Sequence, residues 1–280
     1  MPDSATLAVL RDVVSLTVTA MMLGIIAYGF LRLKCPALAW NERGNVPAAS
    51  YSLPDIYVAT MLGMILLWGL DGQAEATKPA ADPTMYMVLL NVVFMLALCV
   101  LLLLYLVVLR GVSPADLFGL RRIPFFRAAV LALLRIIPLY FLVAAVAAIM
   151  AWWAKDIWPD IQPQEAVKAF KTAGSLPLKV MMGIAAVVVA PLVEETVFRG
   201  FIYGVLKRYT DGWFAAVCSA SLFAVVHMHV GSFVPLFVLA LALCAAYERT
   251  GSLLVPMWMH AFFNGTSTTL LLLYPDGPKS

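Results

Sequence analysis

The stretch that decides the fold is residues 85–109, MYMVLLNVVFMLALCVLLLLYLVVL, which contains no charged side chain. An α-helix rises about 1.5 Å per residue, so about 20 apolar residues cross the hydrocarbon core of a bilayer. A second run, residues 13–31, is also uncharged. Buried core helices of soluble proteins have shorter apolar runs than these. The sequence therefore predicts helices that span a membrane.

The composition of the whole chain agrees with this prediction. Of its 280 residues, 63% are hydrophobic and 12% are charged, whereas soluble domains carry about 25% charged residues. The formal net charge is +3, and no block of lysine and arginine indicates a nucleic-acid partner. The four cysteines are scattered without a CxxC pair, so neither a zinc knuckle nor a disulfide framework is predicted.

Eight apolar stretches are long enough to form membrane-spanning helices. They lie at about residues 13–31, 52–70, 85–109, 128–153, 178–198, 212–228, 232–248 and 253–274. We therefore expect an all-α fold, a polytopic integral membrane bundle of about eight transmembrane helices, in the cell membrane if the chain is bacterial. Within it, residues 1–127 would hold the first three helices and an interfacial loop. Residues 128–280 would form the core that carries the polar motifs described below.

Two connections are predicted to contain short helices. A serine–proline pair at residues 113–114 is typical of a helix start, and Gly119 can end that helix. Arg121 and Arg122 follow it, which favours an interfacial helix anchored by arginines. Apolar and charged residues alternate at helical spacing within residues 163–174, which predicts an amphipathic surface helix.

Ionisable side chains at membrane depth are costly and usually functional, and here they gather after residue 190. The first motif is EETVFRG, residues 194–200. On an α-helix, Glu195 and Arg199 share a face and can neutralise each other. Glu194 points about 100° away from that face. The sequence therefore predicts that Glu195 is structural and that Glu194 is available for chemistry.

Two further motifs contain the polar groups that could act with Glu194. They are FAVVH, residues 223–227, and HAFFN, residues 260–264. In the last motif, His260 and Asn264 are four residues apart, so both can face the same point. A single histidine in a membrane helix often bridges only to a neighbouring helix. The three motifs together favour a functional site.

Helical geometry indicates which of these groups can meet. If the helices on either side of the polar break at residues 208–212 form an antiparallel hairpin, Glu194 and His227 each lie about 25 Å from the turn. His260 lies about 15 Å from its own preceding turn, so it is less closely level with them. We expect Glu194, His227, His260 and Asn264 to converge on one cavity.

Such a cluster suits the hydrolysis of an amide. A carboxylate beside an imidazole can hold a water molecule and take its proton. A second imidazole and a carboxamide can donate hydrogen bonds to the oxyanion that forms. No serine or cysteine stands beside either histidine as a nucleophile, and we interpret Ser219 and Ser221 as helix-packing hydroxyls. Direct attack by water, without an acyl-enzyme, is therefore expected.

A metal site is the competing use of the same residues. Glu194, His227 and His260 could supply three zinc ligands and leave a fourth position for water. The HExxH pattern of many zinc enzymes is absent. The carboxamide of Asn264 also suits an oxyanion better than zinc. We therefore expect no cofactor, with zinc as the alternative.

The three motifs resemble EExxxR, FxxxH and HxxxN of the CPBP family of intramembrane proteases, which includes the type II CAAX prenyl endopeptidases. The resemblance covers about residues 178–270. It implies an intramembrane endopeptidase whose substrate is a membrane protein or a lipidated peptide in the bilayer. By this resemblance, Glu194 activates water and His227 helps to position it, while His260 and Asn264 bind the oxyanion.

The resemblance also implies supporting roles for Glu195, Arg199 and Phe223. The family has been described both as metalloproteases and as glutamate-type proteases. Two other classes of function remain open. A non-catalytic membrane scaffold or bacteriocin-immunity-type protein would use the motifs only structurally. An ion- or proton-coupled carrier would use Glu194 and the histidines to bind its cation.

Overall fold

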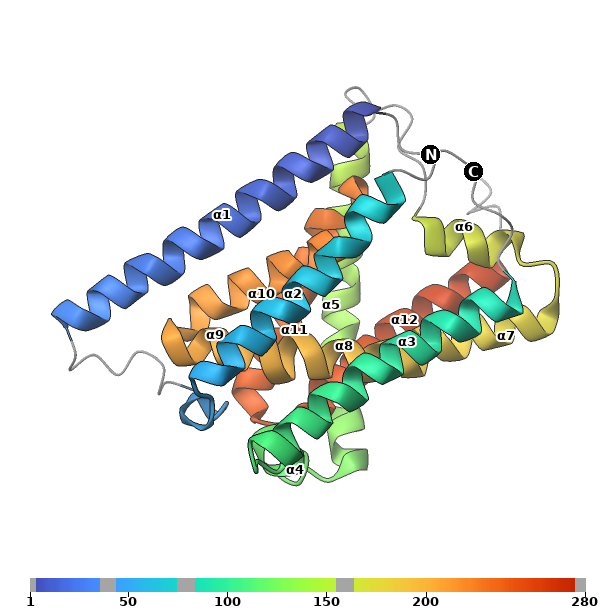
Figure 1. Cartoon of the computed structure of the whole chain (residues 1–280). Helices are drawn as coiled ribbons and strands as arrows, with labels where there is room; N and C mark the ends of the chain where they lie inside the picture. Colours follow the sequence, from blue (N-terminus) through green and yellow to red (C-terminus); the bar gives the residue numbers. More distant parts are fainter. Residues whose placement is uncertain (1–3, 36–43, 75–83, 155–163, 275–280) are drawn as a thin grey trace. The chain divides into compact units, whose positions relative to one another are not determined.

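The computed structural model (Figure 1) describes residues 4–35, 44–74, 84–154 and 164–274, and all regular secondary structure in these ranges is helical. Five helices are long and apolar enough to cross a membrane, judged by length and composition. They are Arg11–Lys34, Met85–Leu109, Phe125–Ala154, Leu176–Tyr209 and Val230–Thr250. The prediction of an all-α, multi-pass integral membrane protein is confirmed.

Each of the eight predicted spans falls on a helical stretch. The stretches are α1 (Ser4–Lys34), α2 (Leu53–Ala74), α3 with η2 (Met85–Leu104 and Tyr105–Leu109), α5 (Phe125–Ala154), the run from α7 to α9, α10 (Gly212–Val226), α11 (Val230–Thr250) and α12 (Leu254–Leu273). The largest difference concerns the fifth span. It was predicted to end near residue 198, and its helix continues to Tyr209.

The fifth span is a composite helix. Its parts are α7 (Leu176–Ile184), η3 (Ala185–Val189), α8 (Ala190–Glu194), η4 (Glu195–Tyr203) and α9 (Gly204–Tyr209). Both η3 and η4 are π-helical, so their backbone hydrogen bonds join residues five apart instead of four. Such segments are rare and occur frequently at functional sites. The first polar motif lies almost entirely within η4.

The short helices that the sequence predicted are also present. The first is α4 (Pro114–Leu117), where the Ser113 hydroxyl accepts a hydrogen bond from the Asp116 amide at 3.4 Å. Gly119 follows with φ +62°, and Arg121 pairs with Asp116 at 3.6 Å. The second is α6 (Glu165–Thr172). A further short helix, η1 (Ala48–Ser50), precedes α2.

The chain forms two compact units that interleave along the sequence. Unit 1 comprises Met1–Pro79, Phe141–Gln162 and Phe198–Gly251, and unit 2 comprises Ala80–Tyr140, Pro163–Val197 and Ser252–Ser280. Each unit therefore takes segments from both sides of the boundary at residues 127 and 128. That residues 128–280 form the catalytic core stays a prediction. The helix η4 begins in unit 2 and ends in unit 1.

In unit 1, α10 and α11 pack along each other and α1 contacts both. Gly24 of α1 faces the ring of Phe214 so closely that a Cβ atom would overlap it. The ring of Tyr28 lies 5.2 Å from the same ring, and its hydroxyl donates a hydrogen bond to Asp211. Asp211 also caps α10 by accepting hydrogen bonds from the amides of Trp213 and Phe214 at 2.6 and 2.9 Å.

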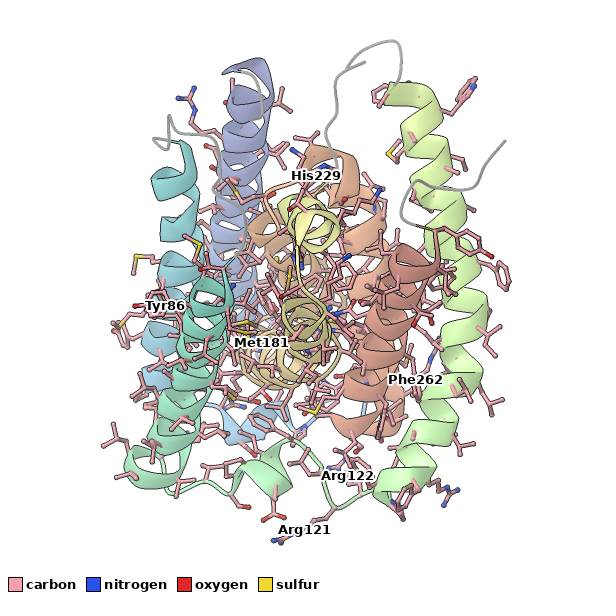
Figure 2. The ribbon with its side chains drawn as sticks, turned by 90° about the vertical axis from the view of Figure 1, so that its right-hand side faces the viewer. Tyr86, Arg121, Arg122, Met181, His229 and Phe262 are labelled. Atoms are coloured by element: carbon pink, nitrogen blue, oxygen red, sulfur yellow. The ribbon has the colours of Figure 1, made fainter. Side chains whose placement is uncertain are left out.

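In unit 2, α12 packs against η3 and α8, and α3 contacts the same part of the composite helix. The amide of Leu253 donates a hydrogen bond to the Phe118 carbonyl at 3.0 Å, which ties the start of α12 to the end of α4. Many large apolar side chains of α3 remain exposed, as expected for a surface that faces lipid. Tyr86, labelled in Figure 2 beside α3, is 72% exposed.

Candidate active site

Unit 2 brings together two acids of the first motif and the histidine of the third. The Nδ1 atom of His260 lies 2.8 Å from Oε1 of Glu195, and its Nε2 atom lies 3.8 Å from Oε2 of Glu194. His260 and Glu195 are almost completely buried, whereas the Glu194 side chain keeps 20% of its surface exposed. One imidazole therefore lies between a buried carboxylate and a partly accessible one.

The bond from His260 to Glu195 determines how the ring can act. Because a carboxylate only accepts hydrogen bonds, Nδ1 is the donor in this contact. This hydrogen bond fixes the orientation and the tautomer of the ring. Its Nε2 atom faces Glu194 at a distance longer than the usual limit of about 3.2 Å. The two side chains are therefore close neighbours without a direct hydrogen bond between these two atoms.

Asn264 lies one turn after His260 on α12 and contacts η3, the first π segment of the composite helix. Its Nδ2 atom donates a hydrogen bond to the carbonyl of Ala186 at 2.8 Å. Pro191 has no N–H group to offer the carbonyls of the preceding turn, so the carboxamide supplies a donor there. An amide nitrogen carries two hydrogens. The contact with Ala186 therefore uses one of the two donors of this group.

Unit 1 holds the remaining motif residues around one aromatic ring. The guanidinium carbon of Arg199 lies 4.4 Å from the ring centroid of Phe223, a cation–π distance. The ring of His227 lies 4.6 Å from the same centroid, and its Nδ1 bonds to the Phe223 carbonyl at 2.7 Å. Phe198 packs edge-on against Phe223 at 5.2 Å. The first residue of the FxxxH motif is thus a platform for an arginine and a histidine.

The structure therefore places the predicted site residues in two groups. Unit 2 contains Glu194, Glu195, His260 and Asn264, and unit 1 contains Arg199, Phe223 and His227. Convergence of Glu194 and His227 on one cavity stays a prediction. Ser219 donates its hydroxyl to the Phe198 carbonyl at 3.0 Å and is fully buried, in agreement with its predicted packing role.

Two features of the site were not anticipated from the sequence. The contact between Glu195 and His260 was missed because α-helical spacing directed Glu195 toward Arg199, and that predicted pair stays a prediction. The role of Phe223 was also missed, although its place in the second motif was noted. A buried ring four residues before a histidine was the available signal.

For the zinc alternative, unit 2 supplies two donor atoms. Because Nδ1 of His260 is bonded to Glu195, its Nε2 atom and the carboxylate of Glu194 are the groups that could bind a metal. A zinc site of the catalytic kind has three protein ligands. Among the described residues, no group of three or more His, Cys, Asp or Glu side chains has a suitable arrangement. Zinc stays an untested alternative.

One segment of the chain is similar to a known protein family. Residues 176–266 match the family model described as type II CAAX prenyl endopeptidase Rce1-like. This segment is similar to the Rce1-like family. It contains the composite helix, the acid–histidine contact and all three polar motifs. The resemblance predicted from those motifs is confirmed.

Two curated relatives overlap the chain in part. The first is the Bacillus subtilis (strain 168) protein named "Putative membrane peptidase YdiL", 30% identical over 95 residues, which are 34% of this chain and 38% of that protein. The second is an "Uncharacterized 24.3 kDa protein" of Escherichia coli, 32% identical over 105 residues, or 36% and 46% of the two chains. The similarity thus spans less than half of either relative. No solved structure matches the chain.

Proposed function

We propose that this chain is an intramembrane endopeptidase of the CAAX-protease type. Glu194 activates a water molecule that attacks the peptide bond of a membrane-associated substrate. His227 helps to position the water, and His260 and Asn264 bind the oxyanion. The single observation that carries the proposal is the buried imidazole of His260 between the carboxylates of Glu194 and Glu195.

The difference in burial between the two acids supports their different roles. Glu195 is fully buried and hydrogen-bonded to His260, so it can orient the imidazole ring. Glu194 is accessible enough to meet a water molecule. The carboxylate of Glu194 lies beside His260, with 3.8 Å between Oε2 and Nε2, so a water molecule held by Glu194 would be close to the imidazole. General-base catalysis needs this proximity between the base and the proton that it removes.

The reaction then follows from ordinary amide chemistry. The Glu194 carboxylate takes a proton as the water oxygen bonds to the scissile carbonyl carbon. The carbonyl oxygen becomes an oxyanion, which N–H donors of His260 and Asn264 can stabilise in a water-poor site. Glu194 then returns the proton to the leaving amine as the C–N bond breaks. The proposed reaction therefore needs no covalent intermediate with the enzyme.

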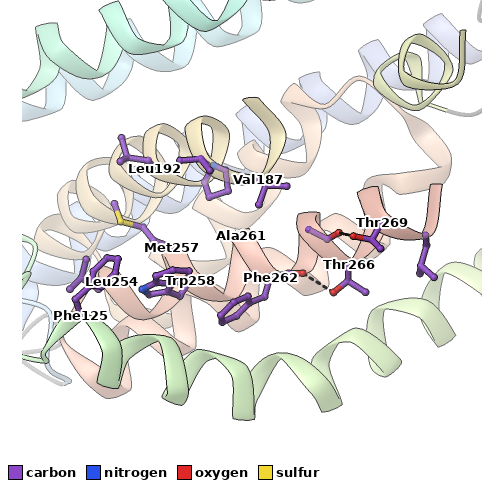
Figure 3. A pocket seen from close by; sticks show the side chains of 14 residues that line it. Phe125, Val187, Leu192, Leu254, Met257, Trp258, Ala261, Phe262, Thr266 and Thr269 are labelled. Carbon is purple, nitrogen blue, oxygen red and sulfur yellow. Dashed lines mark hydrogen bonds between the residues drawn. The ribbon is translucent and has the colours of Figure 1, made fainter. Parts of the chain in front are cut away.

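An apolar cavity beside the site supports a membrane-associated substrate. It has a volume of about 720 Å³ and lies between η3, α8 and α12, with Phe125 at one end (Figure 3). Val187 and Leu192 line one wall, and Met257 and Trp258 belong to α12. Cavities of this size hold drug-sized ligands. It can take apolar side chains or the lipid group of a substrate, either a membrane protein or a lipidated peptide.

The test compares membranes that contain the wild-type chain with membranes that contain Glu194→Gln. Both are incubated, and the new peptide termini that arise are identified by mass spectrometry. We expect a set of termini that only the wild-type chain produces. Asp116→Asn serves as the matched acid-to-amide control because Asp116 is exposed and far along the chain from the motifs.

Two outcomes would count against the proposal. The same termini with Glu194→Gln would remove Glu194 as the base. No wild-type-specific termini, with the protein folded, would favour the non-catalytic scaffold. Adding a zinc chelator to the same incubation tests the metal alternative. The proposed reaction, which uses no metal, should continue, whereas a zinc-dependent reaction should stop.

A further inference from the structure

Residues 45 and 46, which precede α2, are tied to helices far along the chain within unit 1. The amide of Asn45 donates to the carboxylate of Glu248 at 3.2 Å. Lys207 is fully buried, donates to the Val46 carbonyl at 3.1 Å and pairs with Glu248 at 2.6 Å. These contacts join residues 45 and 46 to α9 and α11. They hold in place the residues that follow, which end at Tyr51.

Tyr51 contacts one turn of the composite helix in three ways. Its hydroxyl donates a hydrogen bond to the Gly200 carbonyl. Its ring lies edge-on to Phe201 at 6.1 Å. It also covers Gly204 so closely that any Cβ atom there would overlap the ring. Tyr51 is only 2% exposed, so water does not compete for the carbonyl.

The π register explains why this carbonyl needs a donor. Bonds in η4 join residues five apart, whereas bonds in α9 join residues four apart. If the amide of Gly204 makes the last hydrogen bond that reaches back five residues, and the amide of Val205 makes the first that reaches back four, then the carbonyl of Gly200 accepts no backbone hydrogen bond. A buried carbonyl without a donor is costly. The phenol of Tyr51 supplies the missing donor.

Tyr51 is suited to remain a donor over the working pH range. Burial, and the nearby Tyr247 and Asp55, raise the pKa of Tyr51 well above its usual value near 10. The hydroxyl therefore keeps its proton wherever a membrane protein of this kind would work.

We propose that Tyr51 is a positioning residue for the catalytic motif, acting through the Gly200 carbonyl to hold η4 in its π register. The proposal rests on the proposed peptidase function. The same helix carries Glu195 and Arg199 of the EExxxR motif. A change from π to α spacing would remove the extra residue from the turn. Positions on either side would then rotate relative to each other by about 100°.

The test uses the full chain in detergent with Tyr51→Phe, which removes only the hydroxyl. Tyr57→Phe is the matched control, because Tyr57 lies on α2 and is 73% exposed. Hydrogen–deuterium exchange is measured over peptides within residues 198–209. We expect exchange there to be at least about five-fold faster in Tyr51→Phe, the lower end of the loss of one buried hydrogen bond. The control should match wild type.

A second pair of variants tests the packing of the ring. Gly204→Ala should displace Tyr51 and reproduce the faster exchange in residues 198–209. Gly63→Ala adds the same methyl group to α2, where nothing lies within 4 Å, and should leave the exchange unchanged.

The catalytic readout uses a fluorogenic peptide that spans one cleavage site found with the wild-type chain. We expect kcat to fall about ten-fold in Tyr51→Phe with KM unchanged, because the base is misplaced while the binding surface is intact. Three results for Tyr51→Phe would each overturn the inference. They are unchanged exchange in residues 198–209, exchange that is faster by the same factor in all helices, and unchanged kcat although the exchange has changed. If no cleavage depends on Glu194, the proposed function fails, and the exchange measurement alone still decides whether Tyr51 holds the register.

Discussion

The two groups of motif residues compensate buried charge in different ways. In unit 2, the buried carboxylate of Glu195 is bonded to an imidazole at 2.8 Å, and the second carboxylate lies close to the same ring. In unit 1, the buried guanidinium of Arg199 lies against the face of Phe223. The contact of Glu195 is thus with a group that can exchange protons, whereas the contact of Arg199 with Phe223 is with a ring that cannot. The proposed mechanism therefore assigns proton transfer to Glu194 in unit 2 and a structural role to Arg199 in unit 1.

The largest effect that would test this division is on turnover. Glu194→Gln keeps the shape of the side chain and removes the base, so turnover should fall by about 10²–10⁴-fold. The melting temperature should stay near that of the wild type because Glu194 is partly exposed. Turnover is followed with the fluorogenic peptide, and thermal unfolding is followed in detergent. An active Glu194→Gln variant would assign the base elsewhere.

The second effect is on stability and concerns the arginine. Arg199→Ala truncates a fully buried large side chain and removes its contact with the Phe223 ring, and a large-to-small change of this kind should cost about 2–5 kcal/mol. Lower expression and a lower melting temperature should accompany the loss of activity. Arg199→Lys keeps the charge and loses the planar stacking. Its melting temperature and activity should therefore lie between those of the wild type and those of Arg199→Ala. If Arg199→Ala melted like wild type, the structural role would be refuted.

A smaller effect is expected at the carboxamide of unit 2. Asn264→Leu leaves the Ala186 carbonyl without its side-chain donor, which should cost about 1–3 kcal/mol in stability. If the second N–H group of Asn264 also binds the oxyanion, kcat falls by more than the stability loss explains. Asn264→Asp removes the donor but keeps the size, and serves as the comparison. Equal kcat values for the wild type, Asn264→Leu and Asn264→Asp would exclude an oxyanion role for Asn264.

The smallest effect concerns the aromatic platform. Phe223→Leu keeps an apolar side chain and removes the ring under Arg199 and His227. A cation–π contact of this kind contributes up to about 2 kcal/mol when it is desolvated, and stability should fall by that order. Phe263→Leu on α12 is the control, since its ring packs against Tyr140 and not against a cation. A similar loss in both variants would show that only packing matters.

Much of the fold could be predicted because apolar length is a strong signal. Runs such as residues 85–109 have no charge and correspond to helices within a few residues at either end. The fifth span was predicted too short because Glu194, Glu195 and Arg199 reduced its hydropathy. The hydrogen bond between Glu195 and His260 and the stacking of Arg199 on Phe223 help to compensate those charges, and the helix continues to Tyr209, before Asp211 caps the next one.

The site was predicted less completely because side-chain spacing does not reveal the backbone register. Ordinary α-helical spacing joins residues four apart, whereas the backbone hydrogen bonds of η4 join residues five apart. The contact of Glu195 with His260 also depends on packing between residues 65 positions apart, which no local pattern encodes. Gly200 and Gly204, four residues apart in a polar helix, were the available hint that another side chain approaches closely.

The anchoring of residues 45 and 46 has a consequence for the biosynthesis of the chain. Asn45 and its partner Glu248 are separated by 203 positions, and Val46 and Lys207 by 161. At about 5–20 residues per second, a ribosome needs roughly 10–40 s to reach Glu248 after it has made Asn45. The first two helices therefore enter the membrane long before these residues can dock. Until α11 has been made, Lys207 lacks the carboxylate of Glu248 with which it pairs in the folded chain.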